Sequence, residues 1–202
     1  MKDEMDILRE MGTISAGQGS IALSEIIGRK INLKVPALTF VSGTDILNRF
    51  RENQIVVSIL GNLLTGLEGK ILFLLDEKSA YKLIDMCYGR KPDEKQCGVF
   101  TEMGMSLMKE VGNVVISSFV GALSILLKSL IIPSIPTLVN GPIKQILNMI
   151  LSSDDEYVLF IETTFEEPQQ NITGCFYLVL TPQTVQFIQT ACKKMLENIN
   201  QS

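Results

Sequence analysis

The sequence predicts an α+β fold in which an antiparallel sheet packs against long helices. Two observations lead to this prediction. Residues 10–36 resemble residues 110–136, and in both parts of the chain a long helical stretch is followed by strand-like runs. Strand hairpins interleaved with long helices are typical of helices laid on an antiparallel sheet. We therefore expect one internally duplicated, pseudo-two-fold domain, made of repeats at about 1–95 and 96–202.

The composition is that of a chain that folds by packing alone. Its 202 residues are enough to bury a sizeable core without disulfides or metals. Hydrophobic residues make up 46% of the chain and the mean hydropathy is +0.26, which suits largely buried strands. The net charge of -4 comes from 18 basic and 22 acidic residues spread along the sequence without a basic stripe. Nucleic acid is therefore not expected as a partner.

The repeat is visible residue by residue. Identities in the two long segments fall at Glu10/Glu110, Gly12/Gly112, Ala22/Ala122, Leu23/Leu123, Ser24/Ser124, Ile31/Ile131 and Pro36/Pro136. Farther along, the run 69–75 resembles the run 174–180 at a slightly larger offset. A period of about 100 residues is far longer than a solenoid unit. We interpret the pattern as a duplication that folds as one domain.

Each repeat is expected to open with a long helix. The first should end at Gly28, because glycine readily takes the left-handed conformation that caps helices. Apolar and β-branched runs then predict strands, two of which should form a hairpin. Helices are predicted at 4–27, 78–88, 101–127, 142–151 and 183–198, and strands at 31–41, 54–61, 69–75, 156–164 and 172–180. A polar linker, 89–101, separates the repeats.

Cysteine usage and the absence of a targeting signal indicate a cytoplasmic protein. The cysteines are Cys87, Cys97, Cys175 and Cys192. They lack C-x-x-C spacing and the chain has no histidine, so we interpret them as reduced thiols, mostly in the core. The amino terminus is acidic and has no apolar signal core. The apolar run 114–127 ends at Lys128 and is too short to span a bilayer, so it predicts a buried core helix without membrane insertion.

A polar face runs along each long helix, because positions that step by four and three residues share one side. In the first helix these positions hold Asp6, Glu10, Thr13, Gly17, Ser20 and Ser24, and in the second Ser106, Glu110, Asn113, Ser117, Val120 and Ser124. Any amphipathic helix has a solvent face, so one Glu/Asn pair means little alone. Its carboxylate recurs in both repeats while the surrounding sequence has diverged, which favours a functional interpretation.

These residues resemble the signature of the CheC family of chemotaxis phosphatases. That signature is Asp or Ser, three residues, Glu, two residues, Asn, then 22 residues and Pro. The second repeat matches it at Ser106, Glu110, Asn113 and Pro136. The first repeat matches it at Asp6, Glu10 and Pro36, but Thr13 stands where the family has Asn. The resemblance extends along both repeats and implies the CheC-like fold.

The resemblance also implies a reaction, the removal of phosphate from the aspartyl phosphate of the response regulator CheY. Glu110 would engage the regulator's active-site lysine, and the Asn113 amide would orient a water for in-line attack on phosphorus. This suits phosphoryl transfer, which needs positioning and electrostatic stabilisation more than a strong base. A neutral amide accepts a hydrogen bond from water and donates another without repelling the phosphoryl group. Magnesium is expected on the regulator, and no cofactor on this chain.

The remaining signature positions have different expected roles. The first repeat should hold a weak or silent site, because the Thr13 hydroxyl cannot offer the separated donor and acceptor of an amide. Ser106 and Asp6 either contact the regulator or only begin the exposed face. Pro36 and Pro136 should shape the chain that enters a strand, since proline fixes φ.

Two other functions stay open. A noncatalytic adaptor is one, because CheC-like domains occur in the flagellar switch proteins FliM and FliY, and CheC proteins can bind the receptor deamidase CheD. Segment 142–151 is a candidate partner-binding helix. The other is the related CheX phosphatase, a dimer with one motif per chain, and two repeats favour the CheC arrangement over it. Retention of Glu110 and Asn113 favours chemistry over scaffolding, and we expect no additional switch domain after Ser202.

Overall fold

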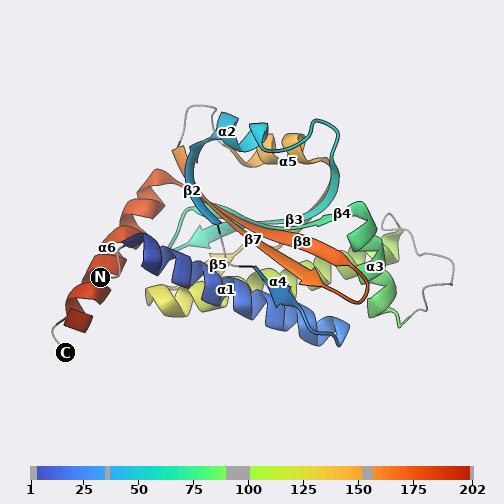
Figure 1. Cartoon of the computed structure of the whole chain (residues 1–202), viewed down its shortest axis with the longest axis horizontal. Helices are drawn as coiled ribbons and strands as arrows, with labels where there is room; N and C mark the ends of the chain where they lie inside the picture. Colours follow the sequence, from blue (N-terminus) through green and yellow to red (C-terminus); the bar gives the residue numbers. More distant parts are fainter. Residues whose placement is uncertain (1–3, 35–36, 90–100, 152–156, 201–202) are drawn as a thin grey trace.

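A computed structural model gives the fold and describes residues 4–34, 37–89, 101–151 and 157–200. At its centre is an antiparallel sheet, with two long helices side by side across one face and two short helices over the other (Figure 1). The predicted class, α+β with long helices on an antiparallel sheet, is confirmed.

The two halves of the chain follow the same order of elements. The first half contains α1 (Glu4–Ile27), β1 (Asn32–Leu33), β2 (Ala37–Ser42), α2 (Gly43–Asn48), β3 (Ile55–Thr65), β4 (Gly69–Asp76) and α3 (Glu77–Cys87). The second half contains α4 (Glu102–Leu127), β5 (Ile132–Pro133), β6 (Thr137–Pro142), α5 (Ile143–Ile150), β7 (Tyr157–Glu167), β8 (Ile172–Leu180) and α6 (Pro182–Asn200). The boundary predicted near residue 95 lies outside the described residues.

The sheet is built by exchange of strands between the halves. Its order is β1-β7-β8-β4-β3-β5, with β2 also pairing β7 and β6 also pairing β3. The short strands of each half therefore lie beside the hairpin of the other half. Because each hairpin is flanked by strands of the other half, the strands of both halves share one sheet.

The register at the centre of the sheet fits a pseudo-two-fold relation. Here β4 pairs with β8, and Leu72 lies opposite Tyr177. The offset of 105 that carries Gly69 onto Gly174 (174 minus 69) also carries Leu72 onto its own partner. An axis through this pair would exchange the two hairpins.

Hydrophobic cores fill both faces of the sheet. The larger core lies between the sheet and the α1/α4 pair, and four of its rings belong to Phe73, Phe119, Phe165 and Phe176. Neighbouring centroids among these rings are 5.3 to 5.9 Å apart, a spacing at which aromatic rings attract one another. The smaller core lies under α2 and α5, with Ile46, Ile143 and Leu147 buried there. Both layers of helices are thus held by apolar packing.

By length and composition, α4 is the one helix in the described part of the chain that could cross a membrane. Half of its most apolar window is buried inside the protein. That helix packs beside α1 and against β3 and β4. Its buried apolar residues belong to the larger core, as the sequence predicts for a core helix.

Several local predictions need correction. The single strand predicted at 31–41 is two strands, β1 and β2, and the strand predicted at 54–61 continues to Thr65. The sequence also fails to predict α2, β5 and β6. Pro133, Gly141 and Pro142 argue against strands by composition, but pairing of β5 and β6 with β3 at the sheet edge overrides that preference. Long-range pairing is not visible in a local pattern.

Candidate functional site

The candidate residues of the second half lie in the amino-terminal part of α4. Thr101 caps this helix, and its Oγ1 accepts a hydrogen bond from the Gly104 N–H at 3.1 Å. Ser106, Glu110 and Asn113 are all exposed. Residues three and four apart on a helix have Cβ atoms about 5–6 Å apart. The structure therefore places these three side chains on one exposed face.

The opposite side of α4 fixes the direction in which this face points. Val111 and Gly112 are buried. A Cβ at Gly112 would lie 2.5 Å from Cγ2 of Ile59, so only glycine allows the helix to approach β3 this closely. Gly17 in α1 differs, because nothing lies within 4 Å of a Cβ there, so this position does not need a glycine for packing. Contact through Gly112 turns Glu110 and Asn113 outward.

Glu110 and Asn113 have unused hydrogen-bonding capacity. Neither side chain makes a hydrogen bond or ion pair with any residue that the structure describes. An amide offers two donors and an acceptor, and a carboxylate offers acceptors on two oxygens. These groups are therefore available to a molecule that approaches from solvent.

One of the two signature prolines lies in the part of the chain that the structure describes. Pro136 is buried and immediately precedes β6, as expected for a residue that shapes the entry into a strand. Pro36 lies outside the described residues.

Two of the equivalent residues of the first half, Asp6 and Thr13, are already engaged within α1. Asp6, Glu10 and Thr13 are exposed. Asp6 forms an ion pair with Arg9 at 3.3 Å. The Thr13 hydroxyl donates to the backbone carbonyl of Arg9 at 2.8 Å, so its only proton is committed to its own helix. This face lacks an amide and has a hydroxyl that points back along the helix.

The polar face predicted along both helices is shorter than its sequence suggests. Ser20 and Val120 are buried, so the exposed face ends before them. Ser24 and Ser124 cap the helix ends, because each hydroxyl donates to the carbonyl of the residue five positions later. A local pattern does not show this, because burial at these positions depends on packing against the rest of the protein.

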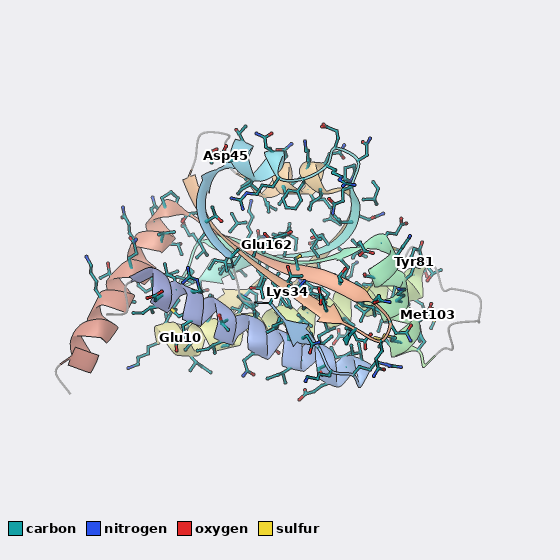
Figure 2. All side chains as sticks on the ribbon, in the orientation of Figure 1. Glu10, Lys34, Asp45, Tyr81, Met103 and Glu162 are labelled. Atoms are coloured by element: carbon teal, nitrogen blue, oxygen red, sulfur yellow. The ribbon has the colours of Figure 1, made fainter. Side chains whose placement is uncertain are left out.

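The amino-terminal parts of α1 and α4, which carry the two faces, lie toward opposite ends of the helix pair. In Figure 1, α1 and α4 run in opposite directions. Glu10 lies toward one end of the helix pair, and Met103, in the first turn of α4, lies toward the other (Figure 2).

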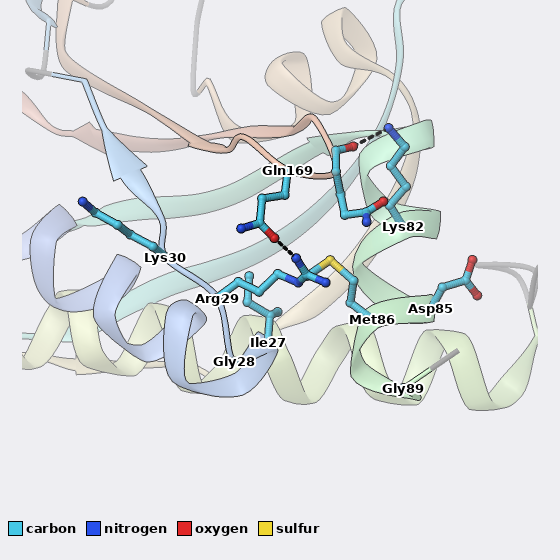
Figure 3. A pocket seen from close by; sticks show the side chains of 10 residues that line it. Ile27, Gly28, Arg29, Lys30, Lys82, Asp85, Met86, Gly89 and Gln169 are labelled. Atoms are coloured by element: carbon cyan, nitrogen blue, oxygen red, sulfur yellow. Dashed lines mark hydrogen bonds between the residues drawn. The ribbon is translucent and has the colours of Figure 1, made fainter. Parts of the chain in front are cut away.

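A cavity of about 710 Å³ lies elsewhere, between the end of α1, α3 and the β7–β8 turn (Figure 3). The Arg29 guanidinium donates to Oε1 of Gln169, and Nζ of Lys82 donates to the Gln170 carbonyl at 2.6 Å. Both cations hold the turn, and neither candidate face lines the cavity. The candidate site is thus an open surface rather than a pocket.

The described cysteines are poor nucleophiles. Burial raises the pKa of Cys87 to about 11 and raises that of Cys175 as well, so both thiols stay protonated at neutral pH. Among the described residues, no group of three His, Cys, Asp or Glu side chains is arranged to hold a metal.

Comparison with known proteins gives consistent similarities over most of the chain. No family model matches it. The chain is 27% identical over 174 residues to the CheY-P phosphatase CheC of Bacillus subtilis (strain 168), which covers 84% of this chain and 83% of that protein. The crystal structure of Thermotoga maritima FliY has a TM-score of 0.75 and 25% identity, over 95% of this chain and 96% of that one.

A third similarity concerns the fold alone. The CheX–CheY complex of Borrelia burgdorferi, which contains beryllofluoride and magnesium, includes a chain with a TM-score of 0.55 and 19% identity. The match covers 85% of this chain and 96% of that one.

Proposed function

Because the chain belongs to the CheC/CheX/FliY family, we propose that it is a cytoplasmic phosphatase that dephosphorylates the aspartyl phosphate of a chemotaxis response regulator, CheY. The observation that carries the proposal is the exposed pair Glu110 and Asn113, one turn apart on α4 and without partners among the described residues. The activity in the name of the relative CheC supports it.

Asn113 is the proposed catalytic residue. Its amide oxygen accepts a hydrogen bond from a water and holds that water in line with the scissile bond. The water oxygen attacks phosphorus and the bond to the aspartyl oxygen breaks, which yields inorganic phosphate and a free aspartate on the regulator. Magnesium on the regulator would balance charge at the phosphoryl group.

Glu110 is the proposed anchor for the regulator's active-site lysine. A carboxylate and an ammonium form a charge-assisted hydrogen bond. Since Glu110 lies one helical turn before Asn113, the same contact that binds the lysine would also fix the depth at which the amide enters the site. Ser106, one turn earlier, is a further proposed contact on this face.

The first half is proposed to be silent. The Thr13 hydroxyl already donates to the Arg9 carbonyl, so it has no proton left to donate and reaches less far than an amide. Asp6, Glu10 and Pro36 would then be remnants of the signature.

The test is phosphate release from aspartyl-phosphorylated CheY in the presence of magnesium. The Asn113→Ala variant should lose about a hundredfold in stimulated rate, which corresponds to about 3 kcal/mol for one positioning group. Thr13→Ala is the matched control at the equivalent helix position and should retain the full rate. Equal acceleration by the wild-type protein and Asn113→Ala would refute the assignment.

A second candidate function is a noncatalytic adaptor that binds CheD or flagellar switch proteins. The similarity to FliY suits a link to the flagellar switch, but it does not favour loss of catalysis, because FliY of Bacillus subtilis (strain 168) is named a flagellar motor switch phosphatase. The adaptor would form a stable complex without accelerating phosphate release. Lack of acceleration by the wild-type protein with its own regulator would select this function.

A further inference from the structure

Ile135 is the most exposed large hydrophobic residue in the described part of the chain, at 92% of its surface. Single exposed hydrophobic residues are common on soluble proteins and need no function. The surroundings of Ile135 therefore decide whether its exposure has a function.

The segment around Ile135 is held firmly to the sheet edge. The Ser134 N–H donates to the Asn62 carbonyl at 2.7 Å, and the Asn62 N–H donates to the Ser134 hydroxyl at 3.0 Å. Pro133 pairs with Leu63 of β3 on one side, and buried Pro136 follows on the other. The backbone therefore holds Ile135 in place, and the exposure of its side chain is not caused by fraying.

Ile135 also lies close to Asn113. Gly112 packs on Ile59, and the next residue of β3, Leu60, pairs with Thr137, two residues after Ile135. With strands about 4.8 Å apart and a rise of about 3.3 Å per residue, Ile135 lies on the order of 15 Å from Asn113. A typical interface covers about 800 Å² on each partner, a disc of roughly 16 Å radius. A protein seated over Asn113 would reach Ile135.

We propose that Ile135 is an apolar contact that binds the phosphorylated response regulator beside the Glu110/Asn113 pair. The inference rests on the proposed function and names how that site recognises its partner. Val114, also exposed and next to Asn113, would lie under the same partner. Polar groups at the centre would do the chemistry, and apolar contacts at the side would supply affinity, since hydrophobic burial is the main non-directional source of binding energy.

The test measures binding and turnover separately. Binding is measured by fluorescence anisotropy with labelled CheY held in its active form by beryllofluoride and magnesium. Ile135→Ala should weaken binding about tenfold and Ile135→Asp by about a hundredfold or more. In turnover assays, both variants should raise KM and leave kcat unchanged at saturating phosphorylated CheY, whereas Asn113→Ala should lower kcat and keep its affinity.

Leu130→Ala is the matched control. Leu130 is also a large, exposed aliphatic residue, but it lies beyond the end of α4, about 20 Å along the helix from Asn113. This variant should bind as the wild type does. Equal weakening by Leu130→Ala and Ile135→Ala would overturn the proposal, because the effect would then not be local.

The outcomes separate this inference from the proposed function. If Asn113→Ala abolishes turnover while both Ile135 variants bind like the wild type, the phosphatase stands and the role of Ile135 is refuted. If the wild type neither binds nor dephosphorylates CheY, both proposals fall together. Circular dichroism checks that each variant is folded. We expect the Ile135 variants to fold, because the side chain is 92% exposed and makes little contribution to the core.

Discussion

The helices α1 and α4 bury the same positions with different side chains. Residues 11, 12, 15, 16, 19, 20, 22 and 23 are buried in α1, and so is each residue one hundred positions later in α4. Yet four of these pairs differ sharply in size: Ser15/Val115, Ala16/Ile116, Gly19/Phe119 and Ser20/Val120. At these four equivalent buried positions, α4 therefore carries the large residues and α1 carries the small ones.

The difference shows how two helices with the same buried positions can pack without matching side chains. A Cβ at Gly19 would lie 3.6 Å from the Cβ of Phe119, so the small face of α1 makes room for the large face of α4. Among the described residues, the hydroxyls of Ser15 and Ser20 are buried without a hydrogen-bond partner, a cost that the apolar Val115 and Val120 avoid.

A related contrast appears on the surface. Glu25, Lys30 and Asn32 are exposed in the first half, and Ile125, Leu130 and Ile132 are exposed at the equivalent positions of the second. These equivalent positions are therefore exposed in both halves, whether a polar or an apolar residue occupies them.

The largest expected effect comes from truncating the large member of a pair. Phe119→Ala should lower the free energy of unfolding by about 3–5 kcal/mol, because it opens a cavity next to Phe176 and Gly19. Urea denaturation measures this. Ser15→Ala, on the small face, should leave stability unchanged or raise it, since it removes an unpaired buried hydroxyl. Similar losses in both variants would contradict the asymmetric packing.

A smaller effect is expected from adding one methyl group. Gly112→Ala should destabilise the protein by about 1–3 kcal/mol, because its Cβ would overlap Ile59. Gly17→Ala is the control in α1, where the space is open, and it should stabilise by about 0.5–1 kcal/mol. Thermal melts of the two variants should therefore shift in opposite directions. A shift in the same direction would show that α4 does not need this contact.

The smallest expected effect comes from completing the first signature. Thr13→Asn should raise the stimulated rate by at most about twofold, because two distant sites act independently. The sharper measurement uses the Asn113→Ala background, where Thr13→Asn should restore phosphate release. No recovery there would mean that the first face lacks more than its amide.

Local sequence predicted the elements that carry the candidate site. The spacing of Ser106, Glu110 and Asn113 predicted one helical face, and the structure has all three exposed on α4. The hairpin 54–61 with 69–75 was equally clear, because both strands and their turn are contiguous in the chain. Ile135 was missed, although a single apolar residue between Ser134 and Pro136 was the available signal.

The sequence by itself determined the long helices, the two central hairpins and the places of Glu110 and Asn113, since periodicity and spacing are local properties of the chain. Only the tertiary structure decided which strands cross to the other half and that Ser20 and Val120 are buried. Those features depend on contacts between residues distant in sequence. Such contacts contribute to stability only when the chain has folded back on itself, so a local sequence pattern does not predict them.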